Sequence, residues 1–442
     1  MTALTKKYQT MITQHPKYEI RYEELDPMQL TFQGGISLPI HSWVRLTPSF
    51  SPILVSNLLE EFDCDSGSTV LDPFDGVGTT TLQCQLQGID SIGVELNPFL
   101  HYVALAKTRW NKELTILRTA IHGYLNKLQQ RSHAARNIPL RLFPQKLNIE
   151  LPKLYNYSRW WKDDVLKDLL IARQTISSTD SKQEHQEFFK LGLASILMDV
   201  ANVTYEGVQF TFIDRSRESI NTLRTLRARL QKMYEDLRVV QSGIKRPGRV
   251  DVILGDSTEM HELLKGSKAT CVITSPPYPN RYSYVWNTRP YLYFFSFFSK
   301  ASEASDLDEK SIGGTWGKAT SDLQKGHVQA ENSTIEAIVG SCVDEIRQDN
   351  SLTNTNLMAN YVMRYFNKIH KHVRSLSRVL AGNARLAYVV GNSEIKGVEI
   401  PTDIFLADIF ESQNIMIDRI ARVRKRHSGK RLYESIVYAT AS

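Results

Sequence analysis

A serine, two prolines and a tyrosine interrupt the stretch CVITSPPYPN at residues 271–280. They follow an apolar run that reads as a buried strand. The Ser275 hydroxyl and the Pro276 carbonyl are hydrogen-bond acceptors, and Pro276 and Pro277 stiffen the backbone without N–H groups of their own. Tyr278 adds a flat aromatic face. Such a group suits an aromatic amine, whose N–H bonds must be drawn out of conjugation before the nitrogen can attack. The competing interpretation is a proline-rich turn that ends the strand.

A second candidate site lies in VLDPFDGVGTTT, where a strand is expected to end and a helix to begin near Thr79. Gly76 and Gly78 in the turn allow positive φ and the close approach of a ligand. Glu95 ends the next strand, where dinucleotide-binding folds place an acid on the ribose hydroxyls. This spacing favours a nucleoside-type ligand over an ordinary strand-to-helix turn. A nicotinamide fingerprint needs a third glycine, and Thr81 stands in its place.

Both sites need a scaffold, and the chain alternates strand-like and helix-like patterns around them. Seven largely continuous apolar runs are typical of strands covered on both faces, as in a mainly parallel sheet. These runs are STVLDPF, SIGVELN, RVDVILGDS, ATCVITSPPY, ARLAYVVGNS, NIMIDRIARV and ESIVYATA. Helical patterns lie between them, one ending at Gly88 and one expected to stop at Gly382. The alternation predicts a doubly wound α/β core.

The bulk composition is that of a globular protein of 442 residues with 42% hydrophobic residues and a formal net charge of +7. A moderate positive charge fits a polyanionic partner, although it does not require one. The four cysteines lack CxxC spacing, which argues against a disulfide framework and a structural zinc site. We expect no metal, no secretory signal and no membrane span, and hence a cytoplasmic protein.

Two long segments interrupt the alternation. Residues 100–248 are helical in pattern, and an apolar stripe with three- and four-residue spacing runs from Ile220 to Leu237. Residues 281–355 are polar and read as loop-like. We therefore divide the chain into a catalytic core with the glycine loop (1–100), a helical insertion (101–248), the core with the tetrad (249–280), a second insertion (281–355) and the rest of the core (356–442).

Taken together, DPFDGVGTT and the downstream TSPPY resemble the motifs of amino-group DNA methyltransferases that use S-adenosylmethionine. The serine in the tetrad resembles the cytosine-N4 branch of the family. The adenine-N6 branch usually carries aspartate at this position. The resemblance covers roughly residues 35–100 and 250–442, and it explains neither insertion. It implies a Rossmann-like class I methyltransferase sheet with helices on both faces, and a cytoplasmic protein of a prokaryotic cell that acts at the nucleoid.

The resemblance also implies roles for individual residues. Ser275, Pro276, Pro277 and Tyr278 match the catalytic tetrad. The residues that match cofactor-binding positions are Asp72, Phe74, Gly76, Gly78, Thr79, Glu95 and Asp256, with a looser match at Pro48, Phe50 and Ser51. The reaction implied is direct methyl transfer to the N4 amino group of a cytosine rotated out of duplex DNA.

Two basic stretches are candidates for contact with double-stranded DNA. NRYSYVWNTRPYLYFF mixes arginines with tyrosines and a tryptophan directly after the tetrad, which suits a phosphate backbone and an unstacked base. RVRKRHSGKR lies between the last two expected strands and reads as a hairpin tip. The candidate DNA-binding residues are Arg281, Tyr282, Arg424, Lys425, Arg426 and Lys430. A buried aromatic helix and a solvated loop are the competing interpretations.

Other functions stay open at this level. The target could be adenine-N6 in DNA, a base in RNA or a glutamine amide in a protein, although such relatives usually carry Asp or Asn in place of Ser275. The chain could also bind nucleic acid on a catalytically silent fold. If the target is DNA, family habit implies a cognate restriction endonuclease as partner, and residues 100–248, possibly with 281–355, are expected to read the target sequence.

Overall fold

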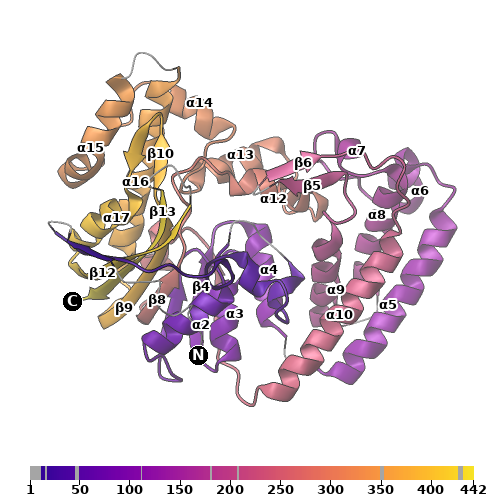
Figure 1. Cartoon of the computed structure of the whole chain (residues 1–442). Helices are drawn as coiled ribbons and strands as arrows, with labels where there is room; N and C mark the ends of the chain where they lie inside the picture. The colour runs from indigo at the N-terminus through magenta and orange to yellow at the C-terminus, as the bar shows by residue number, and fades with distance from the viewer. Residues whose placement is uncertain are drawn as a thin grey trace, which may run out of the picture.

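The structure is a computed structural model that describes residues 11–14, 17–44, 49–110, 112–179, 182–206, 209–348, 353–426 and 432–442. Within these residues, nine strands form a central sheet in the order β1-β2-β12-β13-β9-β8-β3-β4-β7 (Figure 1). The strands are β1 (Met11–Gln14), β2 (Glu19–Tyr22), β3 (Thr69–Asp72), β4 (Asp90–Glu95), β7 (Val250–Leu254), β8 (Ala269–Thr274), β9 (Leu380–Gly391), β12 (Ile415–Lys425) and β13 (Tyr433–Ala441). All seven runs expected from the sequence are strands of this sheet.

The directions of the strands define the fold. β7, β4, β3, β8 and β9 are parallel to one another, and β13 lies antiparallel between β9 and β12. The crossover connections place parallel strands side by side in an order that differs from the chain order, as in Rossmann-like sheets. The expected α/β fold with a Rossmann-like methyltransferase sheet is confirmed.

Helices cover both faces of the sheet because neighbouring residues of a buried strand point to opposite sides. On one face Val70 packs with α2 (Pro52–Glu61) and α3 (Thr79–Leu86). On the other face Leu71 packs with α16 (Thr355–Ser377) and α17 (Thr402–Glu411). The helix expected to stop at Gly382 thus ends at Ser377, and Gly382 itself lies in β9.

Shorter elements complete the core. These are α1 (Pro27–Leu30), η1 (Phe32–Gly35), η2 (His41–Trp43), α4 (Pro98–Thr108), η4 (Ser257–Glu259), α11 (Met260–Leu263), β10 (Ser393–Ile395) and β11 (Val398–Ile400). Helix α4 packs against β7 and α3. The boundary expected at residue 101 therefore falls inside a core helix, and the helical insertion begins after α4.

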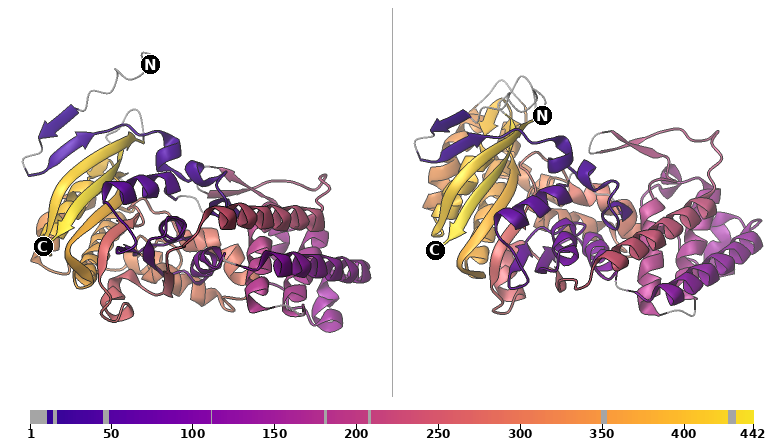
Figure 2. Two further views of the ribbon diagram at one scale, coloured as in Figure 1. Left: turned by 90° about the horizontal axis from the view of Figure 1, so that it is seen from below. Right: turned by 60° about the horizontal axis from the view of Figure 1, so that its bottom comes forward.

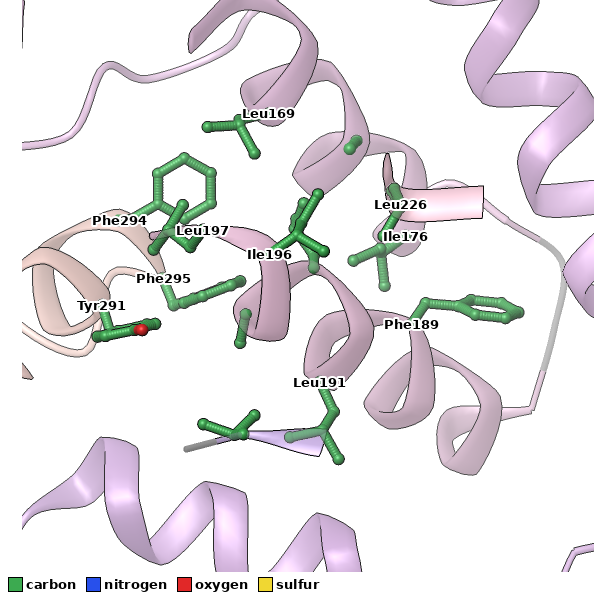
Figure 3. Packing of buried hydrophobic residues seen from close by; sticks show 14 of the residues in the cluster. Leu169, Ile176, Phe189, Leu191, Ile196, Leu197, Leu226, Tyr291, Phe294 and Phe295 are labelled. Carbon is green, nitrogen blue, oxygen red and sulfur yellow. The ribbon is translucent and has the colours of Figure 1, made fainter. Parts of the chain in front are cut away.

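The insertion is a bundle of helices that projects to one side of the sheet (Figures 1 and 2). Its elements are α5 (Leu114–Ala135), η3 (Leu140–Leu142), α6 (Phe143–Leu147), α7 (Tyr157–Trp160), α8 (Asp163–Ser177), α9 (Gln183–Ile196), β5 (Val203–Glu206), β6 (Gln209–Phe212) and α10 (Thr222–Gly243). Leu226, Leu230, Met233 and Leu237 of the predicted stripe are buried in this bundle. Figure 3 shows Phe294 and Phe295, which follow the tetrad in the chain, packed among its side chains.

The expectation that residues 281–355 are loop-like is wrong. The segment folds into α12 (Tyr284–Phe294), α13 (Ala301–Lys310), α14 (Lys318–Gln324) and α15 (Ser333–Gln348). In α15 the apolar residues Ile335, Val339, Val343 and Ile346 are buried against α16 and α17, and polar residues such as Glu336, Ser341, Asp344 and Glu345 lie between them. A single apolar stripe therefore suffices for a helix, even where the composition is mostly polar. No helix in the described part of the chain is long and apolar enough to cross a membrane.

Candidate active site

A cavity of about 320 Å³ lies at the edge of the sheet where the parallel strands end. Ligands of open α/β sheets bind at this edge, because the loops that follow the strands meet there. Its wall includes Phe74 and Gly76 after β3, Glu95 at the end of β4, Asp256 after β7 and Ser275 after β8. The cofactor loop and the tetrad, 200 residues apart in the chain, thus face one cavity.

Glu95 organises the glycine loop. Its Oε2 accepts a hydrogen bond from the Gly76 amide at 2.9 Å, and its Oε1 accepts one from the Asn97 amide at 2.7 Å. Gly76 has φ 56°, in the left-handed region that favours glycine. Burial at the cavity wall raises the pKa of Glu95 to about 7, although the two amides oppose this shift. The carboxylate therefore fixes the loop and presents an acid to the cavity.

Gly78 does not line the cavity, although the sequence suggested that it contacts the ligand. It has φ 79° and precedes α3, and a Cβ atom there would lie 3.1 Å from both the Cα and the Cβ of Ala104 in α4. The glycine is needed for the close packing of α3 on α4. Thr79, at the first position of α3, does line the cavity.

Asp72 lies behind the cavity rather than in its wall. Its Oδ1 accepts hydrogen bonds from Thr274 Oγ1 at 2.5 Å and from the Phe74 amide at 3.0 Å. Among the described residues its Oδ2 is buried without a partner. Burial raises the pKa of Asp72 to about 6. Because Thr274 immediately precedes the tetrad, Asp72 joins the strand end of the glycine loop to that of the tetrad.

Asp256 lines the cavity and begins η4, where its Oδ1 accepts a hydrogen bond from the Thr258 amide at 2.9 Å. The next carbonyl, of Ser257, lies 3.3 Å from Nδ1 of the buried His372. The other ring nitrogen of His372 lies 2.9 Å from Tyr388 Oη. These contacts hold the loop after β7 against α16 and β9.

The segment before α2 closes one side of the cavity. Phe50 and its neighbour Ser49 line it. Ser51 instead caps α2, since its Oγ donates to the Met28 carbonyl at 2.8 Å and accepts from the Ile53 amide at 3.1 Å. The expected role of Ser51 in cofactor binding is thus replaced by a structural one, and Ser49 takes its place in the wall. Pro48 lies outside the described residues.

The tetrad is held from two sides. Ser275 Oγ donates its proton to the Val389 carbonyl of β9 at 3.0 Å. The Pro277 carbonyl accepts a hydrogen bond from Tyr365 of α16 at 2.7 Å. Pro276 is buried between them and is not part of the cavity wall. Because the Ser275 proton is already committed to Val389, the oxygen faces the cavity as an acceptor.

Tyr278 is fixed by a chain of polar contacts from the last hairpin. Its Oη donates to Glu434 Oε1 at 2.9 Å, and Glu434 Oε2 accepts from Arg424 Nε at 2.8 Å and Nη2 at 2.7 Å. The ring packs on the backbone of Gly391, where a Cβ atom would lie 2.6 Å from it. Tyr278, Glu434 and Arg424 all line the cavity.

The structure separates the residues expected to bind DNA. Arg281 and Lys425 are exposed and lie outside the cavity wall, and Arg426 lies at its rim with Nη1 on the Asn392 carbonyl at 3.0 Å. Two of the candidate residues are not free surface residues. Tyr282 is 8% exposed and lines the cavity, and Arg424 is paired with Glu434. Lys430 lies outside the described residues.

Sequence reasoning missed several residues of the wall. The missed residues include Ser49, Asp75, Asn97, Lys310 and Glu434. Asp75 and Asn97 lie within the quoted glycine-loop and second-strand motifs, so their proximity to Gly76 and Glu95 was a usable signal. Glu434 had none, because only the antiparallel register places it opposite Gly391.

The charges of the wall are divided between its two ends. Asp75, Glu95 and Asp256 lie on the glycine-loop side, whereas Arg424, Arg426 and Glu434 come from the last hairpin beside the tetrad, where Glu434 is paired with Arg424. Lys310 also lines the wall. Burial also raises the pKa of Asp75. Closely placed buried acids are stabilised by a cation, and S-adenosylmethionine carries a sulfonium and an ammonium group. The acidic end therefore fits this cofactor. No group of three or more His, Cys, Asp or Glu in the described ranges could hold a metal ion.

The chain is similar over most of its length to curated methyltransferases. It is 24% identical over 440 residues to the type II methyltransferase M.BsoBI of Geobacillus stearothermophilus, covering 90% of this chain and 82% of that protein. It is 23% identical over 437 residues to M.AvaI of Anabaena variabilis, covering 90% and 84%. M.MvaI of Kocuria varians is 20% identical over 361 residues, covering 78% and 74%. No protein-family model matches the chain.

Among solved structures, the rRNA methyltransferase aviRa of Streptomyces viridochromogenes aligns with 12% identity and a TM-score of 0.28, over 89% of this chain and 86% of that one. A TM-score this low carries no argument about fold or function. The sheet order, the glycine loop and the tetrad define the class: this is a methyltransferase that uses S-adenosylmethionine. The curated relatives, which are similar over most of the chain, are named type II methyltransferases and agree with this class.

Proposed function

We propose that this enzyme transfers a methyl group from S-adenosylmethionine to the N4 amino group of cytosine in duplex DNA, with the target base rotated out of the helix. We further propose that it protects DNA as the modification half of a restriction–modification pair. The similarity to proteins named type II methyltransferases over 90% of the chain supports this role. The cognate endonuclease is part of the proposal.

The observation that carries the proposed chemistry is the hydrogen bond from Ser275 Oγ to the Val389 carbonyl, and the choice of cytosine over adenine rests on the resemblance of the serine tetrad to the cytosine-N4 branch. It orients the serine so that its lone pairs, and not its proton, are available to the cavity. An exocyclic amine is a donor of two N–H bonds, so it needs acceptors. A serine whose proton is already committed can serve as one, in place of the aspartate of adenine-N6 enzymes.

The chain's own residues perform the alignment in this mechanism. The Ser275 hydroxyl accepts one of the two amino N–H bonds and draws the nitrogen lone pair out of the ring. The Pro276 carbonyl is the second acceptor that the resemblance implies, and it would have to reach the base from behind the cavity wall. The Tyr278 ring, fixed by Glu434, offers a flat surface for the flipped base. S-adenosylmethionine supplies the electrophilic methyl group when bound, with Glu95 and Asp256 as candidate ligands for its nucleoside part. Alignment of this kind accounts for large rate accelerations without a covalent intermediate.

The basic end of the cavity supports a nucleic acid as the substrate. Arg426 lies at the rim beside the tetrad, where an anionic backbone would approach, whereas Arg424 is paired with Glu434, and the chain carries a net charge of +7. The helical insertion beside the cavity is our candidate for the part that reads the target sequence.

The test is a methyl-transfer assay with labelled S-adenosylmethionine and plasmid DNA of varied sequence, followed by mass spectrometry of the nucleosides. N4-methylcytosine is the expected product. N6-methyladenine would overturn the role given to Ser275 while retaining the reaction class. If the cofactor binds and no nucleoside in DNA is methylated, DNA is not the substrate. RNA, a glutamine amide in a protein and a silent nucleic-acid-binding protein are then the alternatives to test.

A further inference from the structure

Helix α12 leads from the wall of the cavity to the surface of the molecule. Its first two residues, Tyr284 and Val285, line the cavity, and the next residue, Trp286, is 39% exposed. The Arg289 guanidinium lies over the Trp286 ring at 3.3 Å and within 5.6 Å of the Trp160 ring. Trp160 belongs to the helical insertion, so Arg289 stands at the junction of the insertion and the catalytic core.

A second arginine stands at the same junction. Arg159 is exposed and precedes Trp160 in the chain, and its guanidinium lies 3.9 Å from the Phe212 ring of the β5–β6 hairpin. Phe212 in turn packs edge-on against Trp160 at 4.8 Å. Two arginines that are 130 residues apart in the sequence thus belong to one aromatic cluster: Arg289 lies near the Trp160 ring, and Arg159 lies over Phe212, which packs against that ring.

Neither arginine is neutralised by an acid within the part of the chain that the structure describes. Arg289 Nε is buried without a hydrogen-bond partner, and burial lowers the pKa of Arg289 to about 10, so it stays charged at neutral pH. Other arginines near the site differ: Arg424 is paired with Glu434 and Arg215 with Glu218. The two unpaired cations are therefore available to an external anion.

The Trp286 ring is held by contacts that connect it to the start of α12, near the tetrad. The Trp286 ring packs edge-on against Trp316 at 5.4 Å. Asp308, which is fully buried, accepts hydrogen bonds from the Trp316 amide and from the hydroxyl of Ser283, the N-cap of α12. The position of the Arg289 guanidinium is thereby coupled to the start of α12, five residues after Tyr278.

We propose that Arg159 and Arg289, held on aromatic rings beside Trp160, bind two backbone phosphates of the duplex next to the target base. We call Arg159, Trp160, Trp286 and Arg289 the arginine clamp. The inference rests on the proposed function, because it assumes that DNA enters the cavity. A guanidinium held over an aromatic ring loses little freedom on binding, and its terminal nitrogens can donate to phosphate oxygens.

The clamp is tested by the salt dependence of DNA binding, measured by fluorescence anisotropy on a duplex that the wild-type enzyme methylates. Each lost phosphate contact lowers the slope of log K against log salt concentration by about 0.9. Arg289→Gln and Arg159→Gln are each expected to lower the slope by about that amount and to weaken binding about tenfold at low salt. The double variant is expected to lose about twice as much slope. Affinity for S-adenosylmethionine is expected to stay unchanged.

Two controls sharpen the result. Arg249→Gln removes an exposed arginine that is paired with Asp90 at the amino end of β7, on the sheet edge opposite the cavity, and is expected to keep the wild-type slope. Trp286→Phe keeps a flat ring under Arg289 and is expected to bind like the wild type, whereas Trp286→Ala is expected to resemble Arg289→Gln.

Wild-type slopes in both arginine variants would overturn the clamp while leaving the methylation reaction intact. If the wild-type enzyme methylates no DNA, the proposed function fails and the clamp with it. If Arg289→Gln does not fold, the salt slope of Arg159→Gln tests the clamp by itself. This variant is expected to fold because the Arg159 side chain is exposed.

Discussion

The Tyr278 hydroxyl donates a 2.9 Å hydrogen bond to Glu434, which lies 156 residues further along the chain on the antiparallel strand β13. The same carboxylate binds Arg424 of β12 through its other oxygen. The last hairpin therefore fixes the aromatic member of a tetrad that belongs to another strand. This relationship makes Glu434 a positioning residue for the proposed reaction.

We expect Glu434→Gln to lower kcat without changing the affinity for S-adenosylmethionine. The variant keeps the shape of the side chain but removes the charge that holds Arg424, so the Tyr278 ring loses its orientation. A fall of about tenfold corresponds to about 1.4 kcal/mol, the size of one charge-assisted hydrogen bond. Single-turnover methyl transfer measures it. Tyr278→Phe, which keeps the ring and loses only the hydroxyl, is expected to lose no more than Glu434→Gln. A larger loss in Tyr278→Phe would assign the hydroxyl a role beyond this contact.

We expect Ser275→Ala to lower kcat by roughly a hundredfold, because one acceptor for the amino group is lost in the transition state. Binding of S-adenosylmethionine is expected to remain within about twofold of wild type. Calorimetric titration with cofactor and single-turnover kinetics with DNA separate the two effects. Full activity in this variant would remove Ser275 from the mechanism.

Gly78→Ala is expected to destabilise the protein by about 2 kcal/mol, because an L-residue is strained at positive φ and the new Cβ meets Ala104 at 3.1 Å. Any loss of cofactor binding in the variant would follow from the displaced α3, not from contact with the ligand. The free energy of unfolding in urea measures the effect. Gly123→Ala in α5 is the matched control, since no atom lies within 4 Å of the added Cβ. Helix propensity predicts that it stabilises the protein by about 1 kcal/mol. Equal stability of the two variants would contradict the packing role of Gly78.

Binding of S-adenosylmethionine is expected to strengthen as the pH rises from 6 to 8. Burial raises the pKa of Glu95 to about 7 and that of Asp72 to about 6, and a cationic ligand favours the ionised acids. If only ionised Glu95 binds, the affinity changes about tenfold over this range. Calorimetry at several pH values measures it, and Glu95→Gln is expected to flatten most of the profile. A pH-independent affinity in the wild type would show that Glu95 does not face the cofactor.

The same shift has a consequence for the stability of the protein without ligand. Glu95 holds its proton to a higher pH when folded than when unfolded, so the folded state binds more protons between the unfolded value of 4.5 and the folded value of about 7. The contribution of Glu95 to stability is thus present below this window and is lost as the pH rises through it. Urea unfolding of Glu95→Gln is expected to show a smaller decline, because the buried Asp72 and Asp75, whose pKa values are also raised, keep their own contributions.

The sequence by itself determined the scaffold and both motifs. Continuous apolar runs predict strands that are buried on both faces, and the glycine turn and SPPY each follow such a run, so the parallel arrangement already implies that they share one edge. These are local patterns, encoded within about ten residues. A buried aromatic helix was one interpretation of the segment that forms α12, but the later helices of residues 281–355 were missed because a polar composition concealed the apolar stripe of α15.

Only the tertiary structure decided which residues face the cavity. Ser49 and Ser51 are neighbours of the same type, yet one lines the wall and the other caps α2. Glu434 reaches Tyr278 only because β13 runs antiparallel beside β9. Such contacts depend on strand register and on helix packing between distant segments, and no local pattern of residues records them. The fold could therefore be predicted from the sequence. The contacts that hold the site residues in place could not, because packing between distant segments determines them.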